Sequence, residues 1–327
     1  MGIDFIIIWV DGKDENWRKK KNAYKASEKG DDSDIRYRDW GLLKYWFRGV
    51  ETFAPWVRKI YFVSDNQCPD WLNKNNGKLH IISHEEFIPK KYLPTFNSHT
   101  IELNLHRIKG LSEQFVYFND DMYLIKAVME KDFFIKGLPV DNANLNPVIL
   151  TEPNGIGNII ANNIGIINSN FSKSAVIRSS PWKWFNVKYG ARIFRTIFLL
   201  PWRHFSGFYN DHLPQPFLKS VYEEVWEKEG QYLDETCKHK FRNYQQDVSQ
   251  WLIRYWQLAS NQFFPGNPYR GKDIDIMTSD FCNIIKKQKF KMICINDNAA
   301  ITDYEQRKMQ LVQTFQEILP QKSNFER

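Results

Sequence analysis

Three polar residues in succession, Asn119, Asp120 and Asp121, follow the apolar run QFVYF at residues 114–118. The run predicts a buried strand. Two adjacent carboxylates at its end repel each other unless water, a cation or a basic group compensates their charge. Paired acids are common in polar turns, but Mg²⁺ also binds to one or two carboxylates together with phosphate oxygens. The pair alone fits either a turn or a site for metal and phosphate.

A second group with possible chemistry is formed by His99, Glu102 and His106. Their spacings of three and four residues place them on one face of a helix, where they could present ligands to zinc. The HExxH pattern is absent, however, and helices carry such residues for packing and capping as well. A zinc site and a packed helix face are the two interpretations.

His212 and Arg242 are further candidates that stand alone in the sequence. His212 lies in DHLPQP, a Pro-rich turn before a helix, and Arg242 lies in the basic run KHKFRNYQQD. A lone histidine is more often structural than catalytic, and a basic run is usually a solvated surface. The chain has no GxGxxG, GxxxxGK[ST] or GxSxG pattern, which argues against the dinucleotide fingerprint, the P-loop and the nucleophile elbow.

The elements that must position these residues follow from hydrophobic periodicity. We expect strands at 3–10, 59–63, 79–83 and 114–118, and helices at 42–53 and 98–109, the second with Ser98 as its N-cap. This order predicts an α/β fold with a largely parallel central sheet. Ligands bind outside the carboxyl ends of such strands. Acids follow three of these strands: Asp11, Asp65, and Asp120 with Asp121.

The second half of the chain is mainly helical in its pattern. Helices are expected at 216–229, 247–260 and 304–319, a Pro/Gly loop at 265–271, and a strand at 291–295 that ends in Asn296-Asp297. In the first half, the charged stretch 13–34 has no sustained apolar face, and we interpret it as a mobile loop with some helix.

Composition excludes several classes of protein. Apolar residues make up 43% and charged residues 25% of the 327 residues, as in ordinary globular proteins. The net charge of +7 suits an anionic substrate or surface, but the basic residues are dispersed and predict no nucleic-acid partner. Four Cys without a CxxC pair, no signal peptide at the N-terminus and no apolar run of about 18 residues predict a cytoplasmic protein.

Read in order, four segments resemble the conserved blocks of the Stealth family of sugar-1-phosphate transferases. The first is IDFIIIWVDG at 3–12, and the second runs from RYRDWGLLKYWF through NSHTIELNLHRI to VYFNDD. The third is HLPQPFLKSVYEEVWEKEG followed by KHKFRNYQQD, and the fourth is CINDN at 294–298. The first two blocks are the most specific and cover about 120 residues.

The resemblance implies a mostly parallel sheet of the nucleotide-sugar-transferase type, GT-A-like and Rossmann-like, with a helical C-terminal part. It also implies a UDP-hexose or UDP-N-acetylhexosamine donor, a glycan acceptor, and Mg²⁺ or Mn²⁺ as cofactor. The acceptor hydroxyl would attack the sugar-proximal phosphorus, so that UMP leaves and a phosphodiester forms in bacterial surface polysaccharide. A zinc hydrolase using His99, Glu102 and His106, and a non-catalytic glycan-binding protein of the same fold, are the alternatives.

Roles for individual residues also follow from the resemblance. His212 is the expected general base, because a neutral imidazole can accept a hydroxyl proton near neutral pH. Arg242 would hold phosphate oxygens through its planar guanidinium. The expected metal ligands are Asp121 and Asp297, with Asp121 counted among the catalytic residues. The residues expected to contact the donor are Asp4, Asp11, Gly12, Asn97, Ser98 and Asp120.

We therefore expect one catalytic domain over residues 1–327, with a donor-binding α/β core at 1–150 and a helical part at 206–327 that completes the site. Between them, residues 181–205 interleave aromatic residues with Lys and Arg. Two interpretations fit this segment: a lid or core helix, or an interfacial segment that docks the enzyme at the inner face of the plasma membrane, near an acceptor on a lipid carrier.

Overall fold

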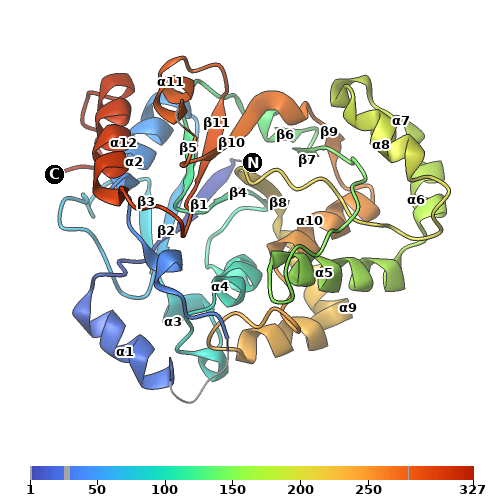
Figure 1. Cartoon of the computed structure of the whole chain (residues 1–327), viewed down its shortest axis with the longest axis horizontal. Coiled ribbons are helices and arrows are strands. Elements are labelled where there is room, and N and C mark those ends of the chain that lie inside the picture. Colours follow the sequence, from blue (N-terminus) through green and yellow to red (C-terminus); the bar gives the residue numbers. More distant parts are fainter. Residues whose placement is uncertain (1, 26–29, 279) are drawn as a thin grey trace.

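A five-stranded sheet forms the centre of the computed structural model, which describes residues 2–25, 30–278 and 280–327 (Figure 1). Its order is β3-β2-β1-β4-β8. The strands are β1 Asp4–Ile8, β2 Ile60–Ser64, β3 Leu79–Ser83, β4 Gln114–Phe118 and β8 Gln215–Leu218. The first four pair in parallel, whereas β8 runs antiparallel to β4. The predicted α/β class with a mostly parallel sheet is confirmed.

The central strands are continuous apolar runs because both of their faces are covered. Phe5, Ile6 and Ile7 of β1 are fully buried, and Ile7 lies opposite Phe62 of β2 and Phe118 of β4. Strands that are buried on both faces lose the alternation of polar and apolar residues that half-exposed strands show. The same register brings the carboxyl ends of β1, β2 and β4 to one edge of the sheet.

Two small sheets flank the central one. The first has the order β10-β11-β5, with β5 Met122–Leu124, β10 Gly271–Asp275 and β11 Met292–Asn296. The second has the order β6-β7-β9, with β6 Phe134–Ile135, β7 Leu138–Asp141 and β9 Phe264–Pro265. β11 confirms the strand predicted at 291–295. β9 and β10 occupy a region predicted in part as a loop, because GKDID has no apolar run to reveal a strand.

The helices agree with the predicted helices more closely in position than in length. Those predicted at 42–53, 247–260 and 304–319 are α2 Leu43–Phe53, α10 Gln250–Ala259 and α12 Tyr304–Ile318. α9 Lys219–Lys238 begins after β8 and is longer than the predicted 216–229. The others are α1 Glu15–Lys25, α3 His84–Phe87, α4 Ser98–Asn104, α5 Ile156–Asn170, α6 Lys173–Ser179, α7 Pro181–Trp184, α8 Arg192–Phe198 and α11 Phe281–Lys286.

Two predictions about the first half need correction. The N-cap of α4 is Asn97, whose Oδ1 accepts a hydrogen bond from the backbone N–H of His99 at 3.1 Å; Ser98 is already helical. The charged stretch 13–34, predicted as a mobile loop with some helix, contains the helix α1 over about half of its length, and its residues 26–29 lie outside the described residues. Its helix is stable without an apolar stripe because Trp17 and Lys21 pack inward.

Residues 206–327 are helical as predicted, but they also supply β8 to the central sheet and two strands to the sheet that contains β5. In Figure 1, α2 and α12 lie together near the C-terminus, and α5, α9 and α10 form a second group. α6, α7 and α8 lie at the opposite edge of the molecule. Within the described ranges, no helix is long and apolar enough to cross a membrane.

Candidate active site

The turn between β4 and β5 carries the two adjacent acids. Met122 donates its backbone N–H to Asn119 O at 3.2 Å, and Ile295 of β11 donates to Asp121 O at 2.9 Å. α2 supports β5 closely, since a Cβ on Gly49 would lie 2.8 Å from Leu124 O. The backbone of the turn is therefore fixed on both sides, and the carboxylates of Asp120 and Asp121 are held at the carboxyl end of β4.

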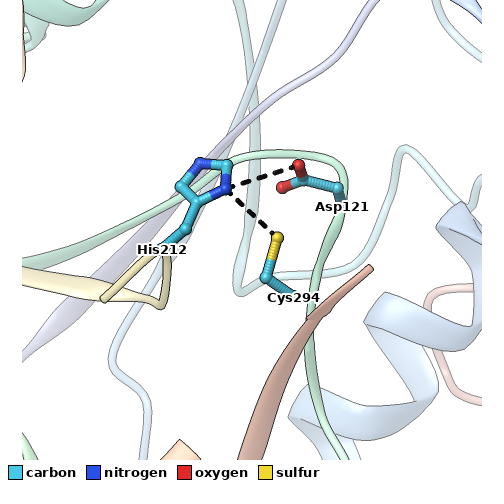
Figure 2. A group of neighbouring side chains, drawn as sticks. All are labelled: Asp121, His212 and Cys294. Carbon is cyan, nitrogen blue, oxygen red and sulfur yellow. Dashed lines mark hydrogen bonds and ion pairs between the residues drawn. The ribbon is translucent and has the colours of Figure 1, made fainter. Parts of the chain in front are cut away.

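Asp121, His212 and Cys294 converge at this turn (Figure 2). His212 Nδ1 lies 3.9 Å from Asp121 Oδ2 and 3.3 Å from Cys294 Sγ. Among the described residues, this is the group of His, Cys, Asp and Glu side chains close enough to share a metal ion. Asp121 Oδ1 is buried and has no hydrogen-bond partner. A buried carboxylate oxygen without a partner is costly unless a ligand completes it.

The protonation of His212 follows from its partners. Tyr117 donates its hydroxyl to Asn119 Oδ1, which directs the Asn119 amide N–H group toward His212 Nε2 at 3.0 Å. Nε2 is then the acceptor, and the proton lies on Nδ1, which faces Asp121 and the Oδ1 of Asn296 at 3.4 Å. The charge of Asp121, 3.9 Å from Nδ1 and outside hydrogen-bond distance, favours the proton on Nδ1 and leaves Nε2 as the base, as in an acid–histidine pair.

Two arginines hold the loop that carries His212. Arg254 of α10 donates to both carboxylate oxygens of Asp141 at 2.8 Å, and also to Tyr209 O and Asn210 Oδ1 at 3.0 Å. Arg192 of α8 donates to both oxygens of Asp211 at 2.7 and 2.8 Å. Bidentate pairs fix geometry as well as charge, so the residues just before His212 are clamped from two helices.

Further carboxylates surround the turn. The surrounding protein, and then the charges of Asp121 and Asp39, raise the pKa of Asp120 to about 8. Its side chain is itself exposed, so repulsion between carboxylates is the cause that a bound cation would remove directly. Desolvation by the surrounding protein, and then the charges of Asp211 and Asp121, raise the pKa of Asp273, whose side chain is also exposed, to about 6 against the opposing effect of His212. The site therefore carries an excess of negative charge.

The donor set fits Mg²⁺ through oxygen atoms. Burial, and then the charges of Asp121 and Asp273, raise the pKa of the Cys294 thiol well above its usual range. The protonated thiol donates to Asn296 Oδ1 at 3.3 Å, and a protonated thiol is a poor metal ligand. The partnerless Oδ1 of Asp121 and the exposed carboxylate of Asp120 remain, which matches the preference of Mg²⁺ for one or two carboxylates plus phosphate oxygens.

Asp297 points away from this group. Its Oδ1 accepts from Arg38 at 3.0 Å and its Oδ2 accepts from the Trp40 indole at 3.2 Å. Both oxygens are therefore committed to the segment before α2. The structure does not bring Asp297 together with Asp121 as a ligand pair, although the sequence predicted both as metal ligands. Asp297 instead ties the end of β11 to residues 38–40.

A second part of the site lies at the start of α4. Arg242 donates to Ser98 Oγ at 2.7 Å, and no carboxylate among the described residues forms an ion pair with this half-buried guanidinium. Burial, and then the charge of Arg36, lower its pKa. The Tyr117 hydroxyl, whose single proton goes to Asn119, lies 3.3 Å from Glu102 Oε1. A series of polar contacts therefore runs from Glu102 to His212 through Tyr117 and Asn119.

The predicted donor-binding residues divide into two sets. Gly12 belongs to the sheet edge, where a Cβ would lie 2.2 Å from Tyr37 O, and Asp11 receives the Gln67 amide at its backbone carbonyl. Ser98 lies with Arg242. Asp4 lies at the amino end of β1, opposite the acidic turn, where its buried carboxylate accepts from Arg58 and from Ser112 N–H. Its structural role is a buried ion pair.

Asn97 is also structural. It is fully buried, caps α4, and donates its amide to Asp247 Oδ2 at 2.8 Å. No polar atom of its side chain is left to contact a donor, so the structure does not favour the role predicted for it. Its neighbour Ser98 retains that role, because its hydroxyl is the group that Arg242 contacts.

The zinc interpretation of α4 fails on geometry. The helix ends at Asn104, and His106 lies in the following 3₁₀ turn Leu105–Arg107, so the three residues do not share one helical face. His99 Nδ1 contacts Asp247 Oδ2 at 3.3 Å, and the His106 ring stacks on Tyr222. Burial lowers the pKa of His106 to about 3. Each side chain packs with a different partner.

Comparison with known proteins agrees with the sequence blocks. The profile of Stealth protein CR2, conserved region 2, matches residues 36–140. The capsular polysaccharide phosphotransferase WcwK of Streptococcus pneumoniae is 44% identical over 99% of this chain and 98% of its own length. The chain belongs to the Stealth family. It is a transferase of the phosphotransferase type.

Other Stealth relatives match over the same length. The exopolysaccharide phosphotransferase cps2G of Lactiplantibacillus plantarum is 45% identical over 99% of this chain and 96% of its own, and the receptor polysaccharide phosphotransferase WefC of Streptococcus gordonii is 44% identical over 99% and 98%. Among solved structures, the galactosyltransferase LgtC with donor and acceptor sugar analogs aligns over 95% of both chains at 8% identity, with a TM-score of 0.40. The fold assignment rests on the strand order of this chain.

Several residues of this Stealth site were missed from sequence. Asn119 stands beside the predicted acids, but only its contacts with Tyr117 and His212 show its role. Cys294 and Asn296 lie in the CINDN block, from which the sequence predicted only Asp297 as a site residue. Asp273 lies beyond the predicted loop at 265–271, in a stretch for which no strand or helix was predicted. The strand pairing of β10 with β11, which brings Asp273 near His212, is the signal that a sequence alone lacks.

Proposed function

We propose that this Stealth protein transfers a hexose-1-phosphate or N-acetylhexosamine-1-phosphate from a UDP-sugar to a hydroxyl of a glycan acceptor. The acceptor oxygen forms a bond to the sugar-proximal phosphorus, the bond from that phosphorus to the bridging oxygen breaks, and UMP leaves. The product is a phosphodiester in a surface polysaccharide. The full-length similarity to polysaccharide phosphotransferases supports the reaction class.

The pairing of Asp121 with His212 is the observation that carries the proposal. A phosphoryl transfer needs a base near the attacking hydroxyl and positive charge near the phosphate oxygens. His212 Nε2 is the acceptor nitrogen, oriented by Asp121 at Nδ1. For catalysis, the acceptor hydroxyl would replace the Asn119 amide at Nε2, donate its proton there and attack the phosphorus as the proton leaves.

The remaining residues organise charge. A bound Mg²⁺ or Mn²⁺ would neutralise the diphosphate, and Asp121 and Asp120 are the residues that would hold it. Arg242 lacks a carboxylate partner within the described structure, which leaves its planar N–H groups free to bind phosphate oxygens. Asp273, close to the backbone of His212 at 3.4 Å, supports the loop that carries the base.

A panel of UDP-sugars with Mg²⁺ and a soluble glycan acceptor tests the proposal. Release of UMP, matched by incorporation of sugar and phosphorus into the acceptor, is the expected result. Release of UDP would mean that the bond at the anomeric carbon breaks, and it would overturn the mechanism. Binding without turnover over a broad panel would instead favour a glycan-binding protein.

A site variant and a matched control make the test specific to the site. Asp70→Asn removes an exposed acid at a turn outside the site, and activity is expected to be unchanged. Asp121→Asn keeps the shape of the side chain and removes its charge, and UMP release is expected to fall by orders of magnitude. Equal activity of the two variants would contradict the assignment of Asp121.

A further inference from the structure

The net charge of the chain is concentrated in one stretch. Residues 153–210 contain seven Lys and Arg residues and no Asp or Glu. The 38 Lys and Arg residues that remain of the total of 45 balance the 38 acids of the rest of the chain. The formal net charge of +7 therefore belongs entirely to this acid-free stretch. A block of 58 residues without an acid is unusual in a chain in which about one residue in nine is acidic.

The same stretch exposes large apolar side chains. Fifteen large apolar residues are exposed among the described residues, and seven of them lie between 182 and 202, with 38% to 87% of their surface accessible. These seven are Trp182, Val187, Phe194, Ile197, Phe198, Leu200 and Trp202. Single exposed apolar residues are normal, but a cluster of this size indicates an interaction surface.

The exposed cluster lies on a rigid support. Trp184 and Tyr189 are fully buried on the inner side of the segment, and Lys183 Nζ donates to Asn261 O at 2.5 Å. Thr196, on the inner side of α8, is fully buried, and its hydroxyl oxygen accepts a hydrogen bond from the backbone N–H of Leu145 at 3.0 Å. The inner side of the segment is core, so its outer side cannot fold inward to hide the apolar residues.

Phe194, Ile197 and Phe198 are spaced three and four residues apart on α8 and therefore share one face of the helix. Leu200 and Trp202 continue this face into the turn that follows. The loop before α5 adds Ile149 and Leu150, because Val148 N–H donates to Ser206 O at 3.0 Å. We call Phe194, Ile197, Phe198, Leu200 and Trp202 the α8 face. It lies at the edge of the molecule opposite the C-terminus (Figure 1).

Cations border the α8 face. Arg195 on α8 and Arg203 directly after Trp202 are exposed, and neither of them forms an ion pair with an acid among the described residues. Exposed Trp and Phe beside Arg and Lys is the composition of segments that lie in the interface of an anionic bilayer, where the rings enter the headgroup region and the cations contact lipid phosphates.

We propose that the α8 face docks on the surface of an anionic lipid bilayer. A second copy of the chain fits less well, because a symmetric interface would bring the same uncompensated cations together. A glycan fits less well, because Val187, Ile197 and Leu200 offer neither rings to stack on sugars nor polar groups to bind hydroxyls. The docking is interfacial, with no segment crossing the membrane.

The docking surface is connected to the active site by one ion pair. Arg192 lies on α8, and its bidentate partner Asp211 immediately precedes His212. A bilayer that binds the α8 face therefore holds the helix that clamps the loop of the base. If the proposed function is correct, this arrangement sets the site at a fixed height above the membrane, where an acceptor on a lipid carrier could reach it.

Vesicle flotation of the full chain tests the docking without any need for catalysis. The vesicles are phosphatidylcholine alone or with about one third phosphatidylglycerol. We expect the protein to float with the anionic vesicles and to bind neutral ones far more weakly. The double variant Arg195→Gln/Arg203→Gln should bind anionic vesicles about 30-fold more weakly, at about fivefold per charge. The triple variant Phe194→Ser/Phe198→Ser/Trp202→Ser should lose roughly 100-fold.

Matched variants elsewhere on the surface control for charge and apolar area. Lys74→Gln/Lys109→Gln removes two exposed cations, and Met129→Ser/Tyr232→Ser/Met309→Ser removes three exposed apolar side chains. Both should float like the parent protein. All substituted side chains are exposed, so unchanged circular dichroism and melting temperature are expected for every variant and confirm that each one folds.

Three results would overturn the proposal: no flotation of the parent protein, equal flotation of the α8 and control variants, or equal binding to neutral and anionic vesicles. Sedimentation that showed a dimer lost in the triple variant, together with no flotation, would assign the face to a second copy instead. Flotation of a protein that releases no UMP would uphold the docking and contradict the proposed function, so the two fail separately.

Discussion

The acidic turn after β4 and the acid-free stretch 153–210 have opposite charge and opposite exposure. Around the turn, desolvation by the surrounding protein and then the charges of neighbouring carboxylates raise the pKa values of Asp120 and Asp273. The acid-free stretch contains only cations and exposes apolar side chains to water. Each region holds an excess that the protein itself does not compensate. An uncompensated excess of this kind indicates a partner of the opposite character.

The two regions are suited to two different kinds of partner. The acidic turn suits a divalent cation bound together with a diphosphate. The cationic stretch suits an anionic surface that also accepts apolar side chains. The two regions meet at the pair formed by Arg192 and Asp211, beside His212. Variants that remove the excess of one region, or this connection, should therefore have distinct effects.

The largest effect is expected from removing the central charge of the acidic turn. Asp121→Asn should lower kcat/KM by about a thousandfold, because it removes both the orienting partner of His212 and a ligand oxygen for the cation. Initial rates of UMP release at saturating Mg²⁺ measure this loss. A variant that kept more than about a tenth of the activity would show that the acidic excess is not the catalytic centre.

Next in size is the loss of the base. His212→Gln should lower kcat by about a hundredfold with little change in KM for the donor, because the base acts on the acceptor hydroxyl rather than on donor binding. Initial rates of UMP release over a range of donor concentrations separate the effect on kcat from the effect on KM. A loss confined to KM would assign His212 to binding.

Breaking the connection between the two regions should cost less. Arg192→Gln leaves Asp211 without its bidentate partner, and we expect kcat/KM to fall about tenfold and the free energy of unfolding by about 2 kcal/mol. Lys238→Gln, at an exposed pair with Asp234 on α9, should change stability by less than about 0.5 kcal/mol. Equal denaturation curves for the two variants would mean that the clamp does not position the loop.

The smallest effect concerns pH and stability of the acidic turn. The pKa of Asp120 is about 8 when folded, against an ordinary value of 3.8, so the folded state binds this proton more tightly than the unfolded state. The contribution to stability is full below about pH 4 and is lost as pH rises toward 8. In metal-free protein, Asp120→Asn should therefore raise the melting temperature by a few degrees at pH 9 and little at pH 5.

Addition of Mg²⁺ at pH 9 should raise the melting temperature of the parent protein and have a reduced effect on Asp120→Asn, because the cation removes the same repulsion. Asp70→Asn serves as the matched acid outside the site. Stabilisation by Mg²⁺ that is equal in all three proteins would place the cation elsewhere.

The contrast between the two regions also explains what the sequence could predict. Apolar runs such as IDFIIIWV and QFVYF make the buried parallel strands visible, and acids directly after them predict the sheet edge. Strand β10 was not predicted because its sequence, GKDID, shows no alternation of apolar and polar residues. It lies at the edge of a small sheet. The position of Asp4 at the amino end of its strand could have been anticipated, since ligands bind at the carboxyl ends.

The contacts that complete the site are beyond sequence reasoning for a physical reason. Arg254 and Asp141 lie 113 positions apart, and Asp297 and Arg38 lie 259 positions apart. Only the packing of α10 and of the segment before α2 decides that these pairs form. The acid-free stretch shows the converse: its charge is plain in the sequence, but which of its aromatic residues are core, as Trp184 is, and which are exposed, as Phe198 is, depends on the fold.

The phosphorus NMR spectrum of the purified product tests the central claim most directly. The account predicts a phosphodiester resonance coupled to the anomeric proton of the transferred sugar, resistant to phosphomonoesterase and formed in step with UMP. A product without phosphorus, formed in step with UDP, would contradict the proposal that the acidic turn and His212 act on the sugar-proximal phosphate.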